Sequence, residues 1–365
     1  MPSRLPPFER ELAAASTLPA FTYTDPAILA AERANIFRRT WQPIGHTADL
    51  VQHGSFLTGE VAGAPVVVTR DAVGKLHGFH NVCRHRAGPV AIGKGTRKSL
   101  TCKYHGWTYT LDGTLTNTPE LGDVKSFDKS CHGLRPIQVA AWGPIVFVNL
   151  DLTGAPLETV LGAIPKETEH LRLDAMKLVA RKDYEIACNW KTYVDNFLEG
   201  YHLPTVHPGL FKELDYDAYR VETHALYSAQ IAPIRAARSG SGAKGERYYA
   251  PSATDPQSAL YYWVFPNWML NIYPDNMSLN IVLPLQAGRT VTVFEWFRHD
   301  GASAEDIERT VAFSDGIQLE DIEICEAVQR GLASGSYEAG RFSVLRENGV
   351  HHFQSLVHEH LVTPR

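Results

Sequence analysis

The sequence predicts an α+β protein with two domains, a small antiparallel β domain followed by a larger antiparallel sheet packed by helices. The chain has 365 residues, of which 44% are hydrophobic, and this length favours two domains over one. Between residues 41 and 152, short β-rich runs are separated by Gly, Asp and Pro at intervals typical of an antiparallel sheet. Residues 153–365 instead mix β-prone runs with helical patterns, which places the domain boundary near residue 152.

The first 40 residues are expected to form a separate helical segment that packs on the second domain. Asp25 and Pro26 suit the start of a helix, and apolar residues follow at helical spacing up to residue 40. The β-rich residues 41–152 come next and account for the first domain.

The second domain, residues 153–365, is expected to begin with a helical stretch over about 156–176 and a strand over about 177–190. A helix from about Lys191 to Leu203 should follow and stop at Pro204. Residues 235–258 are rich in Gly, Ser and charge, and are expected to form a mobile loop or lid. The β-prone runs cover 261–274, 277–285 and 290–297, and helical patterns cover 304–313 and 319–332.

Charge and hydropathy exclude several classes of protein. A net charge of −5 gives no sign of a nucleic-acid-binding surface. The amino terminus carries acidic residues where a signal peptide would be apolar, and no run is apolar enough to span a membrane. We therefore expect a cytoplasmic protein, in which the five cysteines are reduced thiols or metal ligands.

Two of the cysteines alternate with histidines in the pattern C-x-H-x16-C-x-x-H, formed by Cys83, His85, Cys102 and His105. Such a set can close a tetrahedral zinc site, or it can hold a [2Fe-2S] cluster with thiolates on one iron and imidazoles on the other. Zinc fingers usually pair two cysteines on one knuckle and two histidines on the other. Because each segment here carries one of each, the pattern favours the asymmetric cluster, an electron-transfer centre.

A second group of polar residues lies within residues 189–208. On the expected helix, Asp195, Glu199 and His202 share one stripe at i, i+4 and i+7. His202 and His207 are spaced so that both can reach one ion, although a solvated helix face would explain them equally well. A carboxylate from elsewhere would complete the facial triad of non-heme Fe(II) oxygenases.

Asp321 is the best candidate for that carboxylate. On a helix it shares the apolar stripe of Ile324, Cys325 and Val328, so it should point inward, while Glu320, Glu323 and Glu326 point elsewhere. A buried carboxylate needs a compensating partner, and a metal ion is a good one. A helix N-cap is the alternative role for Asp321.

These four ordered motifs together resemble the large (alpha) subunit of Rieske non-heme iron oxygenases, over nearly the whole chain. The resemblance implies a Rieske [2Fe-2S] domain followed by a helix-grip catalytic domain. The "EAVQRGL" and "HHF" segments are most similar to the branch that contains choline monooxygenase and glycine betaine monooxygenase. Family members are commonly homotrimers.

Carried over by the resemblance, Cys83, His85, Cys102 and His105 would bind the [2Fe-2S] cluster, and His202, His207 and Asp321 would bind mononuclear Fe(II). In the family, a carboxylate three residues before the first iron histidine links the two centres across subunits. Glu199 holds that position and would bridge His105 of one subunit to the iron histidine of its neighbour. Most members of the family have an aspartate at this position, and the glutamate favours the quaternary-ammonium branch. Asp195 is the alternative candidate for the bridging carboxylate.

No nucleotide-binding G-x-G-x-x-G follows a strand, so electrons are expected from a separate NAD(P)H-dependent flavin or iron-sulfur reductase. We expect O2-dependent N-demethylation or C-hydroxylation of a betaine-like or choline-like compound. Candidates for an aromatic cage around the cation are Tyr261, Trp263, Phe265, Trp268 and Tyr273. An aromatic-ring dioxygenase or O-demethylase is the alternative, while a Rieske electron carrier or a zinc-stapled binding module would leave the second group of residues unexplained.

Overall fold

The computed structural model describes residues 5–234, 258–273 and 275–363, so nearly all of the loop predicted over 235–258 lies outside the described residues. The chain divides into two compact units. One consists of Phe37–Leu157, and the other combines Met1–Ile36 with Glu158–Arg365.

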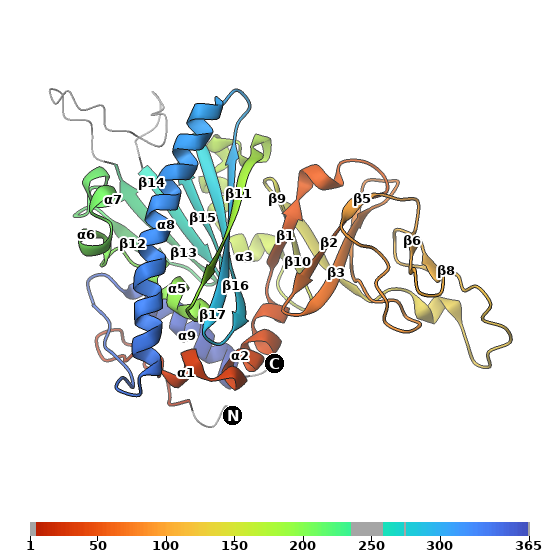
Figure 1. The fold of residues 1–365 in the computed structure, drawn as a ribbon, viewed down its shortest axis with the longest axis horizontal. Coiled ribbons are helices and arrows are strands. Elements are labelled where there is room, and N and C mark those ends of the chain that lie inside the picture. The colour runs from red at the N-terminus through yellow and green to blue at the C-terminus, as the bar shows by residue number, and fades with distance from the viewer. Residues whose placement is uncertain (1–4, 235–257, 274, 364–365) are drawn as a thin grey trace. The chain divides into compact units, whose positions relative to one another are not determined.

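The unit Phe37–Leu157 is built from antiparallel strands (Figure 1). Ala62 and Gly63 both have positive φ angles, and they join two strands of the larger sheet in the tight hairpin turn that such angles favour. The larger sheet has the order β1-β10-β9-β4-β3-β2-β5, and the smaller one is β6-β7-β8. The strands are β1 (Gln42–His46), β2 (Ser55–Val61), β3 (Ala64–Arg70), β4 (Leu76–His80), β5 (Lys94–Thr96), β6 (Leu100–Thr101), β7 (Thr108–Tyr109), β8 (Leu115–Asn117), β9 (Pro136–Trp142) and β10 (Ile145–Asn149).

The other unit contains one seven-stranded antiparallel sheet with the order β11-β17-β16-β15-β14-β13-β12. Its strands are β11 (Lys177–Ile186), β12 (Arg220–Thr223), β13 (Tyr227–Pro233), β14 (Ser258–Val264), β15 (Trp268–Tyr273), β16 (Asn276–Gln286) and β17 (Arg289–Arg298). Hydrophobic residues, including leucine and methionine, make up most of β14 to β17, as is usual for strands buried on both faces. The predicted α+β class is therefore confirmed.

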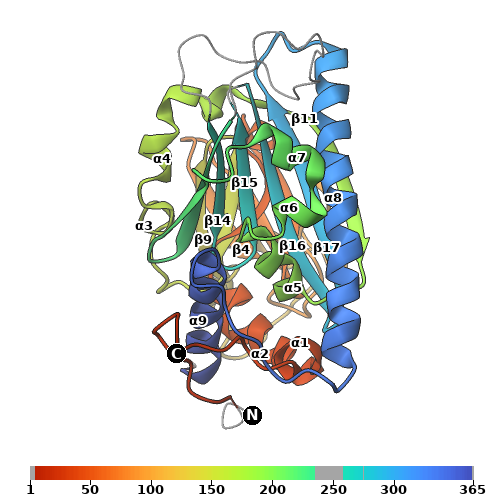
Figure 2. The same cartoon turned by 90° about the vertical axis from the view of Figure 1, so that its left-hand side faces the viewer.

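Helices cover one face of this sheet: Figure 2 shows α5, α6 and α7 in front of the strands, with α8 running along one side and α9 below. The helices are α1 (Phe21–Thr24), α2 (Pro26–Asn35), α3 (Leu157–Leu161), α4 (Ile164–Glu167), α5 (Trp190–Phe197), α6 (Leu203–Val206), α7 (Pro208–Glu213), α8 (Ala304–Ala333) and α9 (Asn348–Val362). Among the described residues, none of the helices combines the length and the apolar character needed to cross a bilayer.

The helix predicted over 191–203 is interrupted. Helix α5 ends at Phe197, and Pro204 lies in the first turn of α6 instead of stopping a helix, a position where its missing N–H costs nothing. Between them, a Cβ atom on Gly200 would lie 2.9 Å from the ring of Tyr219, so this close approach requires glycine. The predicted stripe of Asp195, Glu199 and His202 is therefore wrong, because the last two residues lie beyond the end of α5.

The two helices predicted over 304–313 and 319–332 form one helix, α8, which begins with a capping box between Ser303 and Asp306. Its predicted apolar stripe is also wrong. Cys325 is buried as expected, but Ile324 and Val328 are exposed, and the other buried positions of α8 are Thr310, Gln318 and Gln329. These glutamines are hydrogen-bonded within the unit, so burial did not follow hydropathy here.

Buried charges attach the amino-terminal segment to α5. The Lys191 ammonium lies 2.5 Å from the Glu32 carboxylate, which also accepts a hydrogen bond from Trp190, and all three side chains are fully buried. One turn further along α5, Asp195 accepts hydrogen bonds from Tyr23 and Gln354 at 2.7 and 3.0 Å. Removing either partner of the buried pair would leave an uncompensated charge, so this contact fixes the position of α5.

Asp195 should make stability depend on pH. Burial raises its pKa to about 7, against the hydrogen bonds from Gln354 and Tyr23, which lower it. Between about pH 4 and pH 7 the folded state then holds one more proton than the unfolded chain, so the contribution of Asp195 to stability is lost as the pH rises through that window. The free energy of unfolding in urea should be measured for the protein and for Asp195→Asn at several pH values. The stability of the unmodified protein relative to the variant should fall between pH 4 and 7. A difference between the two that does not change with pH would contradict this prediction.

Candidate metal sites

The first candidate site lies at one end of the unit Phe37–Leu157. Cys83 and His85 follow β4, and Cys102 and His105 lie between β6 and β7. Both cysteines are buried, whereas both histidines are exposed, and the two imidazole rings are 4.6 Å apart between centroids. The four predicted ligands therefore form one site with a sulfur end inside and an imidazole end at the surface.

The two segments that carry these ligands have similar tight turns. Cys83 N–H donates to the carbonyl of Gly88, and Cys102 N–H donates to the carbonyl of Trp107. A Cβ atom on Gly88 would lie 2.9 Å from the Cys102 sulfur, so this glycine leaves room for the sulfur. The ring of His85 stacks on Trp107 at 4.8 Å, which orients the imidazole.

The residues present fit a [2Fe-2S] cluster. Burial, followed by the nearby Cys83, raises the pKa of the Cys102 thiol, so a bound metal would be needed to stabilise the Cys102 thiolate at this place. The Tyr109 hydroxyl lies 3.2 Å from the Cys83 sulfur and can donate a hydrogen bond to it. The separation of sulfurs from imidazoles matches a cluster with thiolates on one iron and imidazoles on the other.

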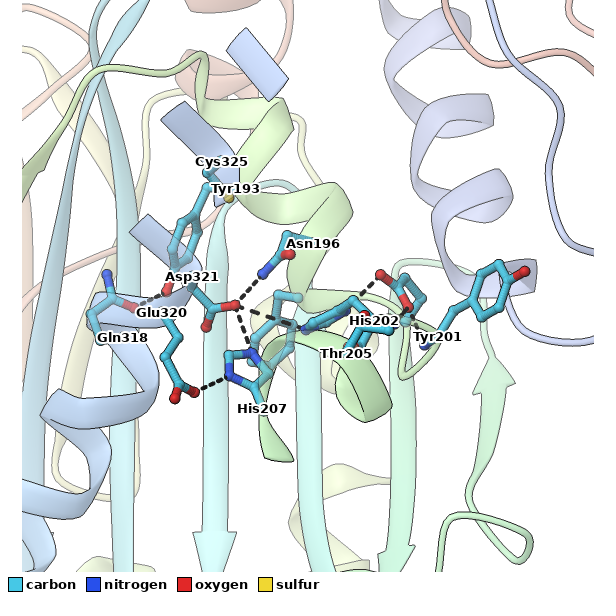
Figure 3. Close-up of polar contacts among 12 residues, drawn as sticks. Tyr193, Asn196, Tyr201, His202, Thr205, His207, Gln318, Glu320, Asp321 and Cys325 are labelled. Atoms are coloured by element: carbon cyan, nitrogen blue, oxygen red, sulfur yellow. Dashed lines mark hydrogen bonds and ion pairs between the residues drawn. The ribbon is translucent and has the colours of Figure 1, made fainter. Parts of the chain in front are cut away.

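The second candidate site is formed by His202, His207 and Asp321, called the triad below. One ligand atom from each residue lies within 4.8 Å of the others, and the described residues contain no other such group of three or more His, Cys, Asp or Glu. Asp321 Oδ1 is 2.9 Å from His207 Nε2 and 3.8 Å from His202 Nε2 (Figure 3). Asp321 lies in the middle of α8, so it is not a helix N-cap.

A carboxylate contacts Nδ1 of each imidazole, the ring nitrogen on the side away from Asp321. Glu199 Oε1 lies 2.6 Å from His202 Nδ1, and Glu320 Oε2 lies 2.6 Å from His207 Nδ1. The prediction that Glu320 points away from the site is wrong, because its carboxylate contacts Nδ1 of the same imidazole that Asp321 contacts through Nε2. A carboxylate on Nδ1 directs Nε2 at the common point of the triad, an arrangement typical of metal-binding histidines.

The charge around the triad suits a cation. Burial lowers the pKa of His207, but the carboxylates of Asp321 and Glu320 raise it more, and the net shift is upward. Asn196 donates a hydrogen bond of 2.6 Å to Asp321 Oδ1 and fixes that carboxylate. Two imidazoles and one carboxylate are the donors of a non-heme Fe(II) site, so the residues present fit that metal.

A cavity lies between the triad and the sheet. Its lining includes the triad and a group of aromatic residues, Phe197, Tyr219, Tyr261, Tyr273, Phe294 and Trp296. Tyr261 and Tyr273 were predicted from the sequence, and their hydroxyls lie 2.9 Å apart. Most of the other rings come from strands or turns that are far apart along the chain, so the sequence alone did not show that they line one cavity.

The other three predicted cage residues do not line this cavity. Trp263 packs against Phe353 of α9, at 5.3 Å between ring centroids, and is fully buried. Phe265 lies beside it, 6.0 Å away. Trp268 alternates with Met269 on β15 and therefore faces the opposite side of the sheet from the cavity-lining Tyr273. The prediction that these rings form a cage is wrong because strand alternation and the cover of α9 direct them elsewhere.

The two candidates for the bridging carboxylate also differ in their surroundings. Glu199 contacts His202 through its ring nitrogen and also accepts from the His202 backbone N–H at 3.1 Å. Asp195 is instead hydrogen-bonded to Tyr23 and Gln354. Of the two, Glu199 is the residue in contact with the triad.

Comparisons with known families match both units. Residues 40–128 match the Rieske [2Fe-2S] domain, and residues 173–362 match the catalytic domain of the ring-hydroxylating alpha subunit. The first range contains all four predicted cluster ligands, and the second contains the triad. The resemblance inferred from the motifs is thus confirmed.

Individual relatives cover almost the whole chain. It is 37% identical to chloroplastic choline monooxygenase of Arabidopsis thaliana, over 97% of this chain and 84% of that protein. It is 31% identical to the carnitine monooxygenase oxygenase subunit of Acinetobacter pittii, over 94% of each chain. The quaternary ammonium Rieske monooxygenase CntA, solved with its substrate L-carnitine, superposes with a TM-score of 0.82 at 28% identity, covering 97% of both chains.

Proposed function

The chain belongs to the family of ring-hydroxylating alpha subunits that carry a Rieske [2Fe-2S] domain, and on that premise we propose that it oxygenates a quaternary ammonium compound. The reaction would be N-demethylation or C-hydroxylation, with O2 as co-substrate. The observation that carries the proposal is the convergence of the triad on a cavity walled by aromatic rings.

The cavity suits a methylated cation. Rings such as Tyr219, Tyr261 and Phe294 attract a quaternary ammonium through their π faces, and the carboxylates of Glu199 and Asp321 add negative charge. Two groups of relatives, the choline and carnitine monooxygenases, are named for substrates of this chemistry.

Each metal site would have a separate role. Cys83, His85, Cys102 and His105 would hold the [2Fe-2S] cluster, and the triad would hold mononuclear Fe(II). The cluster supplies single electrons, and the mononuclear iron supplies a place where O2 is activated. Around that place, Glu199 and Glu320 keep both imidazoles oriented, and Asn196 holds the Asp321 carboxylate.

The electrons would come from outside this chain, through a separate NAD(P)H-dependent reductase that contains flavin or an iron-sulfur centre. We propose a homotrimer in which Glu199 connects His202 to His105 of a second copy. The Glu199 carboxylate already contacts the His202 ring, and the His105 imidazole is exposed. Inter-subunit electron transfer is described for the related quaternary ammonium monooxygenase.

Substrate oxidation with a surrogate reductase would test this proposal. Choline, carnitine, glycine betaine and an aromatic acid would each be incubated with NADPH and O2, and formaldehyde, aldehyde and hydroxylated products measured. We expect product only from the quaternary ammonium compounds. Hydroxylation or O-demethylation of the aromatic acid alone would assign the protein to the alternative function.

The metal content should be about three irons per chain, two in the cluster and one at the triad, in a red-brown protein. Iron, zinc and acid-labile sulfide would be measured on anaerobically purified protein. A colourless protein that contains zinc would contradict the oxygenase function.

A further inference from the structure

One wall of the triad's cavity is polar and uncharged. Asn271 on β15 pairs with Ser278 on β16, and Ser278 pairs on its other side with Trp296 on β17. Asn280 follows Ser278 at the next position on the same face of β16. These four residues, called the amide wall, form a continuous patch of the cavity lining. The three strands that carry it lie side by side behind α5 and α6 (Figure 2).

Three polar atoms of the amide wall have no hydrogen-bond partner among the residues that the structure describes. They are the side-chain oxygens Oδ1 of Asn271 and Asn280 and the indole Nε1 of Trp296. Asn280 is 2% exposed and Trp296 is 1% exposed. A buried polar group without a hydrogen bond destabilises a fold by about 1–3 kcal/mol, so groups of this kind in a cavity wall indicate a ligand that bonds them.

The arrangement of these groups selects the chemistry of the ligand. Asn271 lines the cavity and donates its amide hydrogen to Ser278 at 3.0 Å, which leaves its unpartnered oxygen available as an acceptor. The wall therefore offers two acceptors and one N–H donor. A hydroxyl group both donates and accepts, so it can bond Asn and Trp296 at the same time.

A carboxylate fits the same wall poorly. It carries only acceptors, and it would lie against the two amide oxygens with one indole N–H to bind it. Among the cavity-lining residues that the structure describes, acidic and basic side chains are limited to Glu199 and the triad, and neither Lys nor Arg is present. A desolvated carboxylate without a cationic partner is strongly disfavoured.

We propose that Asn271, Asn280 and Trp296 bind a hydroxyl group of the substrate, so that the protein prefers a quaternary ammonium alcohol to a quaternary ammonium carboxylate. This inference rests on the proposed function. It favours choline over carnitine, the two substrates named among the relatives, because carnitine carries a carboxylate in addition to its hydroxyl. Trp296 has a specificity-determining role, in which its N–H donates to the hydroxyl oxygen while an amide oxygen accepts the hydroxyl hydrogen.

The test compares choline with ethyltrimethylammonium, which is the same cation without the hydroxyl, in the whole protein and in Trp296→Phe. Phenylalanine keeps an aromatic ring and removes the N–H donor. Losing one such hydrogen bond should lower kcat/KM for choline by about five- to tenfold and leave ethyltrimethylammonium within about twofold. Asn280→Leu, of similar shape, should act in the same direction. Ile317→Val, at an apolar position of the same cavity, should affect both compounds alike.

Equilibrium binding by titration calorimetry gives a second readout that does not need turnover. The Kd for choline should rise in Trp296→Phe by the same factor as kcat/KM falls, without a change for ethyltrimethylammonium. If Trp296→Phe lowered the affinity for both compounds equally, the amide wall would bond water and not the substrate hydroxyl, and the inference would be overturned. Tighter binding of carnitine or glycine betaine than of choline would overturn it as well. If none of these compounds were oxidised, the proposed function would fail, and the binding comparison would still decide the role of the wall.

Discussion

Replacing Asp321 with alanine should remove the mononuclear iron and lower substrate oxidation by more than about a thousandfold. The reason is that Asp321 supplies the one carboxylate of the triad, with its Oδ1 2.9 Å from His207 Nε2 and 3.8 Å from His202 Nε2. Without it, two neutral imidazoles would hold Fe(II) weakly. Iron per chain should fall from about three to about two, while the visible spectrum of the [2Fe-2S] cluster stays unchanged.

Two neighbours on α8 provide matched controls. Glu320→Ala removes the carboxylate that contacts His207 Nδ1 and should weaken iron binding or activity by about ten- to a hundredfold. Glu323→Ala changes an exposed acidic residue of the same helix and should alter neither iron content nor activity. If Asp321→Ala retained three irons per chain, Asp321 would not be a metal ligand.

Glu199→Gln should leave both metal sites occupied and nearly abolish coupled turnover. Glutamine can still occupy the space beside His202, but it lacks the charge that a link between two imidazoles requires. Stopped-flow absorbance would follow oxidation of the reduced cluster when O2 and substrate are added. We expect the cluster to stay reduced for about a hundred times longer than in the unmodified protein.

Asp195→Asn separates the two candidates for that link. Its carboxylate is bonded to Tyr23 and Gln354, so the change should mainly affect the pH dependence of unfolding described above. Rapid cluster oxidation in Glu199→Gln together with slow oxidation in Asp195→Asn would reverse the assignment of the bridge.

The four candidate cluster ligands could be proposed from the sequence because each pair lies within one short segment. Residues two or three positions apart, such as Cys83 and His85, must lie close together in any fold, so their spacing carries information without tertiary structure. The same holds for His202 and His207. Their assignment as metal ligands stays a prediction, although the structure places the atoms of the triad within 4.8 Å.

Asp321 shows where sequence reasoning was less secure. We inferred that it points inward because of an apolar stripe through Ile324 and Val328, but both residues are exposed. The buried side of α8 is carried by Gln318, Cys325 and Gln329. Asp321 lies next to that side, so the inference about its direction rested on a pattern that does not exist. Buried glutamines whose hydrogen bonds are satisfied by residues of other elements leave no signal in hydropathy.

By itself, the sequence determined the α+β class, the family and the short-range ligand pairs, because local spacing and strand or helix propensity act over a few residues. Only the tertiary structure decided that Glu320 reaches His207. It also decided that Trp263 and Trp268 do not line the cavity, and that Asn271, Asn280 and Trp296 lie on one wall of it. These contacts join residues that are far apart in the chain or on different strands. They depend on helix rotation and strand register, which are set by the packing of the whole unit.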